Sequence, residues 1–144
     1  MSYHVRVKIC GVTNVEDALR AAALGADAVG LNFHPGSPRC IDVATATPIV
    51  RELPLFTRPV GVFVNKSARE IAAFFEPLNL EWRSYTIQWH GDHHKREIGC
   101  WWPVEVIAAF QVRDKASLDM ISRYLDQCRA EADLPAAILV DAHV

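Results

Sequence analysis

The sequence has few cysteines, and they form no recurring motif. Cys10, Cys40, Cys100 and Cys128 are widely separated along 144 residues, and no C-x-x-C pair occurs. This argues against a disulfide framework and against a structural zinc site, because both use cysteines at short, recurring spacings. We therefore expect four free thiols.

Long hydrophobic runs and an excess of basic charge are also lacking. Every apolar run is far shorter than the ~20 residues that cross a bilayer, and the opening MSYHVRVKIC has no long apolar stretch typical of a signal peptide. The formal net charge is −2 at pH 7, which leaves no broad basic surface for a nucleic-acid backbone. The sequence predicts a cytoplasmic protein that binds neither nucleic acid nor a membrane.

The common nucleotide-binding signatures are missing as well. Neither G-x-G-x-x-G nor G-x-x-x-x-G-K-[ST] follows any apolar run. The composition is otherwise ordinary, with 51% hydrophobic and 22% charged residues, and the length suits one domain over residues 1–144.

Short β-rich runs alternate with amphipathic helical patterns along the whole chain. We expect strands at 5–10, 27–33, 59–65, 82–91, 104–110 and 136–144, and helices at 13–25, 42–53, 66–79 and 114–132, with at best a short helix between 92 and 103. The expected core-facing helical residues are Ile71, Phe74, Phe75, Leu78, Leu118, Ile121, Tyr124 and Leu125. Such alternation predicts an α/β fold with parallel strands, and a repeat of about 26 residues would leave room for about six of the eight units of a barrel.

The stretch VRVKICGVT at 5–13 places Lys8 and Cys10 on the same side of the first expected strand, with Gly11 at the turn beyond. An amine beside a thiol stabilises the thiolate, and α/β enzymes build their sites at the carboxyl ends of strands. The alternative is that Cys10 is a small apolar core residue.

Two further residues follow apolar strands. Asp141 comes after AAILV, where a carboxyl group at an apolar strand mouth would favour its protonated form and could donate a proton; alternatively it caps a following helix. Arg39 lies in the loop HPGSPRC and could bind a carboxylate with two hydrogen bonds, or could simply be solvated.

The histidines of HGDHH raise the question of a metal site. His90 should still lie on a strand, so His90, His93 and His94 do not have the spacing of a common metal site. We expect no bound metal, with solvated loop histidines as the default.

Taken together, six segments resemble the successive strand-end motifs of the phosphoribosylanthranilate isomerase family. They are KICGVT at 8–13, GADAVGLNF at 25–33, SPR at 37–39, VGVFVN at 60–65, QWHGD at 88–92 and ILVDA at 138–142. The resemblance implies a (β/α)8 TIM barrel that carries out, without a cofactor, an Amadori rearrangement in tryptophan biosynthesis. It converts N-(5'-phosphoribosyl)anthranilate into 1-(2-carboxyphenylamino)-1-deoxyribulose 5-phosphate.

The same resemblance implies roles for individual residues. Cys10 would be the general base and Asp141 the general acid, while Arg39 would hold the anthranilate carboxylate, with Lys8 and His90 also binding substrate. It also leads us to expect a further glycine-rich loop and two more strands, which would bind the substrate phosphate, and a monomer or homodimer at full length.

Two other functions remain open from the sequence. One is a non-catalytic, truncated α/β module that binds a partner through an unfilled sheet edge. The other is a different phosphosugar barrel with a related mouth.

Overall fold

The computed structural model describes residues 5–76, 86–91 and 104–142. Strands and helices alternate along these residues, as the sequence predicts, and strands β4 and β5 are joined by a segment outside the described ranges. The elements are β1 (Lys8–Cys10), α1 (Val15–Ala23), β2 (Ala28–Asn32), α2 (Val43–Glu52), β3 (Arg58–Val64), α3 (Ala68–Phe75), β4 (Thr86–His90), β5 (Glu105–Val112), α4 (Lys115–Ala130) and β6 (Ala137–Ala142).

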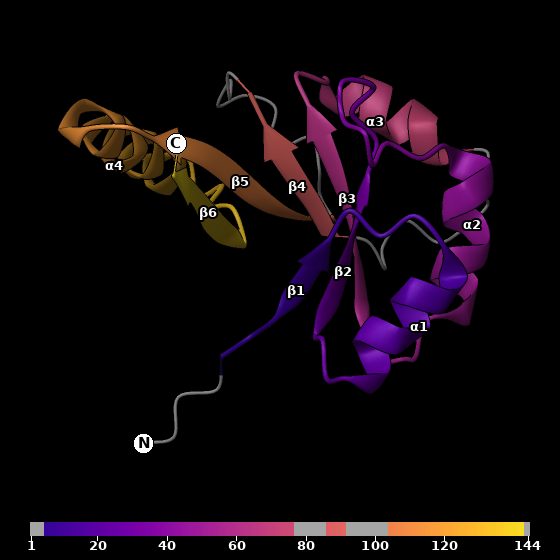
Figure 1. The fold of residues 1–144 in the computed structure, drawn as a ribbon. Coiled ribbons are helices and arrows are strands. Elements are labelled where there is room, and N and C mark those ends of the chain that lie inside the picture. The colour runs from indigo at the N-terminus through magenta and orange to yellow at the C-terminus, as the bar shows by residue number, and fades with distance from the viewer. Residues whose placement is uncertain (1–4, 77–85, 92–103, 143–144) are drawn as a thin grey trace.

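The strands form one six-stranded sheet in the order β1-β2-β3-β4-β5-β6, and every neighbouring pair is parallel. Figure 1 shows that the sheet is curled, with α1, α2 and α3 outside β1–β3 and α4 outside β5 and β6. Strands β1 and β6 are its two edges. The expected α/β fold with parallel strands is confirmed for the described residues.

The apolar core lies between the sheet and its helices. Alternate strand residues point to this outer side, as the period of a β-strand requires. Leu31 of β2 is 2% exposed there and Trp89 of β4 is 3% exposed. Other buried members are Ala18, Val29, Phe33, Ala46, Ile49, Phe63, Ile71, Phe75, Ile87, Val106, Ala108, Phe110, Ile121, Tyr124 and Cys128.

A cluster of aromatic rings holds α3 against the middle of the sheet. The ring centroids of Phe33 and Phe74 are 4.5 Å apart, and those of Phe63 and Phe75 are 5.6 Å apart in an edge-to-face arrangement. Such pairs contribute about 0.5–1.5 kcal/mol beyond their buried area. The prediction that Ile71, Phe74 and Phe75 face the core is confirmed.

Each helix begins at a side chain that accepts a hydrogen bond from the third helical residue. Asn14, Asp42, Ser67 and Asp114 are these N-caps. They satisfy backbone N–H groups that have no partner inside the helix.

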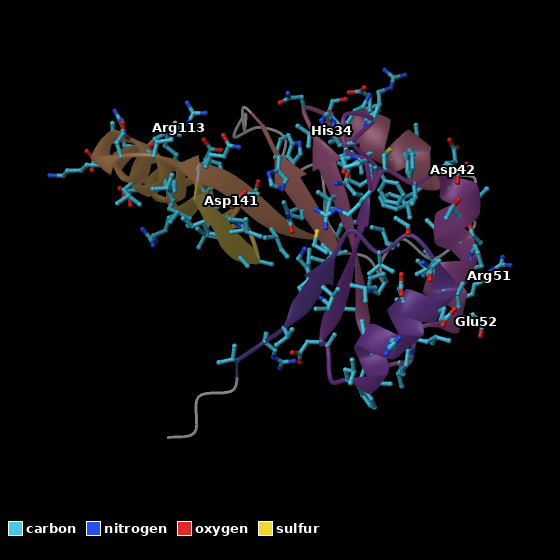
Figure 2. The ribbon with its side chains drawn as sticks, viewed as in Figure 1. His34, Asp42, Arg51, Glu52, Arg113 and Asp141 are labelled. Atoms are coloured by element: carbon cyan, nitrogen blue, oxygen red, sulfur yellow. The ribbon has the colours of Figure 1, made fainter. Side chains whose placement is uncertain are left out.

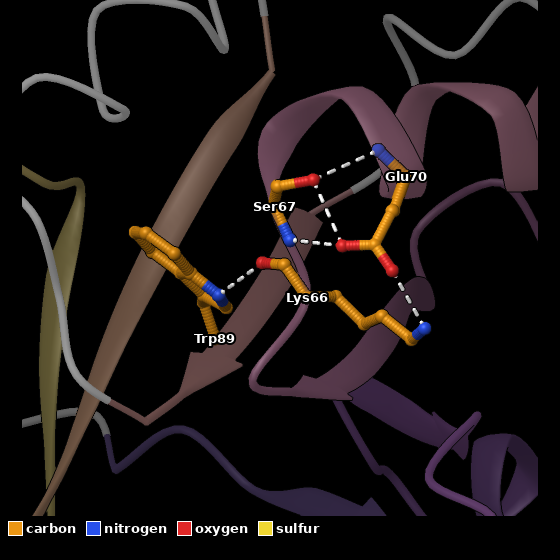
Figure 3. A network of polar contacts seen from close by, with 4 residues as sticks. All are labelled: Lys66, Ser67, Glu70 and Trp89. Carbon is orange, nitrogen blue, oxygen red and sulfur yellow. Dashed lines mark hydrogen bonds and ion pairs between the residues drawn. The ribbon is translucent and has the colours of Figure 1, made fainter.

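The start of α3 is also tied to the neighbouring strand (Figure 3). Ser67 and Glu70 form a capping box, and Lys66 Nζ donates to Glu70 Oε1 at 2.8 Å. The Lys66 side chain and then the Ser67 backbone N–H lower the pKa of Glu70 to about 2. Trp89 Nε1 donates to the Lys66 carbonyl at 2.9 Å, so this helix start is fixed to β4.

Some expectations differ from the structure or fall outside it. Leu118 was expected in the core but is 49% exposed; α4 packs mainly along β5 and buries only a narrow stripe. The first strand is shorter than predicted and begins at Lys8. Leu78 and the short helix expected between 92 and 103 lie outside the described residues.

A membrane-spanning helix was not expected. Among the described residues, no helix has the length and apolar character needed to cross a bilayer. The cytoplasmic location stays a prediction.

Candidate active site

The strand register defines a second face of the sheet, turned away from the helices. Parallel partners such as Cys10 and Gly30, or Gln111 and Asp141, share one side of the sheet. We call this side the concave face. Its members are Lys8, Cys10, Ala28, Gly30, Asn32, Arg58, Val60, Val62, Val64, Thr86, Gln88, His90, Glu105, Ile107, Ala109, Gln111, Ala137, Leu139 and Asp141.

Four of the predicted site residues belong to the concave face. Cys10 ends β1, His90 ends β4, and Asp141 is the residue before the last of β6. Lys8 lies two residues before Cys10 on the same side. Since the carboxyl ends of parallel strands lie at one end of a sheet, Cys10, His90 and Asp141 lie at the same end of the concave face.

Cys10 is an exposed free cysteine, so the alternative that it fills the core is wrong. Its sulfur lies over the neighbouring strand at Gly30. A β-carbon built at Gly30 would lie 2.7 Å from Cys10 Sγ and 3.1 Å from Lys8 Nζ. The thiol and the amine therefore meet above the same residue, as the sequence predicts.

Arg39 reaches from its loop to the end of β1. Its Nη1 donates a 2.8 Å hydrogen bond to the Cys10 carbonyl. The side chain crosses Gly11, where a β-carbon would lie 2.7 Å from Arg39 Cδ, and Gly11 has a φ of +82°. Only glycine combines this backbone conformation with this clearance. The guanidinium is thus held beside Cys10, with further N–H groups available to a ligand.

His90 contacts a second polar residue of the same strand. Gln88 Nε2 and His90 Nε2 are 2.7 Å apart, and the His90 carbonyl accepts from the Asn65 N–H at 2.9 Å. Gln88 is 4% exposed, and its Oε1 is buried without a hydrogen-bond partner among the described residues. A buried acceptor of this kind is available to a donor that enters the concave face.

Asp141 lies on β6 and is exposed (Figure 2). The expected desolvated strand mouth is not observed, because β6 is an edge strand and its outer residue Val140 is also 56% exposed. The register separates Asp141 from Cys10 by the width of the sheet. They lie on the two edge strands of the sheet.

The structure adds Gly30 and Gln88 to the predicted set. An isolated glycine within a strand is a known signal of close approach, so Gly30 could have been found in the segment AVGLN. Gln88 could have been found because it shares the period of His90. His93 and His94 lie outside the described residues, and within those residues no group of three potential ligands could hold a metal ion.

Comparison with known proteins decides the family. The model of the family described as "N-(5'phosphoribosyl)anthranilate (PRA) isomerase" matches residues 7–143. The chain belongs to this family. The predicted resemblance is therefore confirmed over nearly the whole chain.

Two curated isomerases illustrate the relationship. The chain is 41% identical over 141 residues to the N-(5'-phosphoribosyl)anthranilate isomerase of Azotobacter vinelandii, which covers 97% of this chain and 62% of that protein. It is 48% identical over 93 residues to that of Pseudomonas aeruginosa, covering 65% of this chain and 42% of the relative. The chain thus spans about half the length of the curated relatives it matches.

Solved structures of the family share the fold. Phosphoribosyl anthranilate isomerase from Thermotoga maritima superimposes with a TM-score of 0.79 at 36% identity, covering 98% of this chain and 63% of that one. A family member in complex with reduced 1-(o-carboxyphenylamino)-1-deoxyribulose 5-phosphate gives 0.77 at 32% identity, covering 98% and 77%. Monomers generated from the dimeric Thermotoga maritima isomerase give 0.79 at 28% identity, covering 98% and 77%.

Proposed function

We propose that the complete protein is a phosphoribosylanthranilate isomerase of tryptophan biosynthesis. It would convert N-(5'-phosphoribosyl)anthranilate into 1-(2-carboxyphenylamino)-1-deoxyribulose 5-phosphate. The observation that carries this proposal is the arrangement at the end of β1, where the exposed Cys10 thiol lies beside Lys8 and Arg39 is bonded to the Cys10 carbonyl. A thiol, an amine and a guanidinium group lie close together in a member of a family of isomerases, which supports the proposed roles of base, cation and carboxylate-binding group.

In the proposed mechanism, Asp141 acts first. A neutral carboxylic acid can donate its proton to the furanose ring oxygen as the C1'–O bond breaks, which opens the sugar to a Schiff base with the anthranilate nitrogen. The Cys10 thiolate then takes the proton from C2', and the C–H electrons form the C1'=C2' bond of an enolamine as the C=N electrons return to nitrogen. Protonation of C1' and loss of the proton of the C2' hydroxyl then give the ketose. Both steps are acid–base chemistry, so the proposal requires no cofactor.

Substrate binding is assigned to the remaining residues. Arg39 would hold the anthranilate carboxylate through guanidinium N–H groups, since this planar fork matches a carboxylate. Lys8 and His90 would contact the sugar on the concave face. In barrels of this type the phosphate site generally uses the loops after strands seven and eight, so we infer that the complete protein closes the six described strands into an eight-unit barrel.

The test compares the complete protein with residues 1–144, using chromatographic separation of substrate and product. We expect the complete protein to be active and residues 1–144 alone to be inactive and self-associated, because two sheet edges stay unpaired. Cys10→Ala should lower turnover of the complete protein by about 10²–10⁴-fold, as loss of a general base does.

Cys40→Ser is the matched control, because Cys40 is also an exposed free thiol but has no assigned role. Near-normal turnover of Cys10→Ala would rule out the mechanism. A folded complete protein that is inactive with this substrate would instead favour the non-catalytic module or another phosphosugar barrel.

We also propose that the complete protein forms a homodimer through its most exposed apolar side chains. Leu55 is 90% exposed and Phe56 is 92% exposed in the turn before β3, and Leu24 is 83% exposed in the turn before β2. The Arg58 N–H donates to the Asp27 carbonyl at 2.9 Å, so the two turns are neighbours. A relative from Thermotoga maritima is described as dimeric.

Light scattering of the complete protein tests this assembly. The wild type should have the mass of a dimer, and the double variant Leu55→Ser/Phe56→Ser that of a monomer. Leu118→Ser is the control, because Leu118 is exposed on α4, distant in sequence from these turns. A monomeric wild type, or a dimer in all variants, would contradict the proposal.

A further inference from the structure

Gly30 occupies the position on β2 directly beside the proposed base. It pairs with Cys10 in the parallel register and lies on the concave face. A β-carbon there would lie 2.7 Å from Cys10 Sγ, 3.1 Å from the Cys10 α-carbon and 3.1 Å from Lys8 Nζ. A separation of 2.7 Å is well inside the contact distance of carbon and sulfur, so any side chain at residue 30 must displace the thiol.

The same distances limit how far apart the thiol and the amine can be. Both are measured from one point, so Cys10 Sγ and Lys8 Nζ cannot be farther apart than the sum of the two distances. That sum is the upper limit on the distance between the sulfur and the amine nitrogen. The space left by the missing side chain is where the ammonium group approaches the sulfur.

We propose that Gly30 is a positioning residue for the isomerase reaction. By lacking a side chain it lets the Cys10 sulfur and the Lys8 ammonium group converge above β2, which holds the thiolate where it can take the proton from C2' of the substrate. This inference rests on the proposed function, in which Cys10 is the base. Gly30 itself contacts no reacting atom and acts only through Cys10 and Lys8.

The competing explanation is that Gly30 serves packing alone. The chain offers a matched control in Gly61, which lies on the adjacent strand β3 and faces the opposite, helix-covered side. A β-carbon at Gly61 would lie 3.0 Å from Phe63, 3.3 Å from Phe75 and 3.4 Å from Phe33. Gly61→Ala therefore crowds the core without touching the thiol, whereas Gly30→Ala crowds the thiol without touching the core cluster.

The first experiment measures the reactivity of Cys10 itself in the complete protein. Iodoacetamide alkylation at neutral pH is followed by mass spectrometry of the peptide that contains Cys10, which separates it from the other cysteines. The variants are Gly30→Ala, Lys8→Met, the two combined, and Gly61→Ala. This readout does not depend on isomerase activity.

We expect Gly30→Ala and Lys8→Met each to slow alkylation of Cys10 by roughly 1.5- to fivefold, the size expected for losing one partly exposed charge interaction. The combined variant should be no slower than either single variant, because each change removes the same interaction. Gly61→Ala should alkylate at the wild-type rate while unfolding at lower urea concentration. If Gly30→Ala fails to fold, Lys8→Met alone decides, and an unchanged alkylation rate overturns the proposal.

The second experiment measures catalysis by the complete protein. Gly30→Ala should lower kcat by about tenfold or more with little change in KM, because a displaced base impairs the proton transfer and not the binding of the carboxylate. Gly61→Ala should keep its kcat. Unchanged alkylation and kcat in Gly30→Ala, or rate losses that multiply in the combined variant, would overturn the positioning role.

The two proposals fail in different ways. If Cys10→Ala remains active, the proposed function is wrong even when Gly30 and Lys8 still control the reactivity of the thiol. If Cys10→Ala is inactive but alkylation is insensitive to Gly30→Ala, only the positioning role is lost.

Discussion

The outer and concave faces of the sheet come from alternate residues of the same strands, and they differ in what covers them. On β2, Leu31 is 2% exposed beneath the helices, while the preceding Gly30 faces the thiol of Cys10. On β4, Trp89 is buried on the outer face, whereas its two neighbours in sequence, Gln88 and His90, contact each other on the concave face. A period of two thus lets one strand supply packing to one face and reactive groups to the other.

The difference between the outer and concave faces is smaller on the two edge strands of the sheet. On the outer side, Ile9 of β1 is 45% exposed and Val140 of β6 is 56% exposed, whereas their partners on the neighbouring strands, Val29 and Phe110, are 0% and 7% exposed. The residues proposed as base and acid belong to these two edge strands. The interior strands therefore supply most of the packing, and the edges supply the proposed chemistry.

The strongest test of the comparison is a truncation in the outer core. Leu31→Ala should lower the free energy of unfolding by about 2–5 kcal/mol, because the removed methyl groups leave a cavity under α1 and α2. Urea unfolding monitored by circular dichroism measures this. Below the unfolding transition, alkylation of Cys10 should keep its wild-type rate; a slower rate would show that the two faces are coupled.

A substitution beside the carboxyl end of β1 should instead weaken substrate binding and leave the stability of the fold almost unchanged. Arg39→Ala should weaken binding of the anthranilate conjugate by about 1.5–3 kcal/mol, the cost of losing a hydrogen bond to a charged group, and should mainly raise KM of the complete protein. The unfolding midpoint should change little, because Arg39 is exposed.

An analogue without the carboxylate is the control for Arg39. Its affinity should be the same for the wild type and the Arg39→Ala variant. Equal losses for both ligands would show that Arg39 does not bind the carboxylate.

A smaller effect, on stability, is expected for a substitution at the amino ends of the strands. Arg58 forms an ion pair with Glu105 and a 3.2 Å hydrogen bond to Thr86, which links β3, β4 and β5 at their amino ends. Arg58→Met should cost about 0.2–1 kcal/mol of stability, since both charged side chains are more than half exposed. Urea unfolding at low and high salt measures this loss of stability. A change in kcat would contradict the proposal that only residues at the carboxyl ends of the strands take part in the chemistry.

The smallest effect concerns the cap of α3. The folded-state pKa of Glu70 is about 2, below its ordinary value of 4.5. Its ionised form therefore stabilises the fold above about pH 4.5, and this contribution is lost as the pH falls toward 2. Glu70→Gln should unfold at lower urea concentration than the wild type at pH 6, and the difference should vanish near pH 2. A difference that does not depend on pH would contradict this.

The sequence predicted what depends on local pattern. Strand and helix order and the shared side of Lys8 and Cys10 follow from short-range periodicity. These features need no knowledge of distant segments.

Contacts between distant segments could not be predicted in the same way. The bond from Arg39 to the Cys10 carbonyl depends on how a loop folds over Gly11. The exposure of Leu118 and Asp141 depends on which elements cover them, and a helical or strand pattern shows only which side is apolar, not whether that side is covered. The roles of the five predicted site residues stay predictions.

The order of the strands has a consequence for how the protein is made. Every strand pairs with the one that precedes it in the chain, from β1 through β6. Among the described strands, each new strand therefore finds its partner already synthesised. Only the closure of the proposed eight-unit barrel needs a later segment to reach β1. Low sequence separation between contacts favours fast folding, and domains begin to fold during synthesis. The sheet can grow one unit at a time as the chain leaves the ribosome, with the thiol of β1 in place before the carboxylate of β6 has been translated.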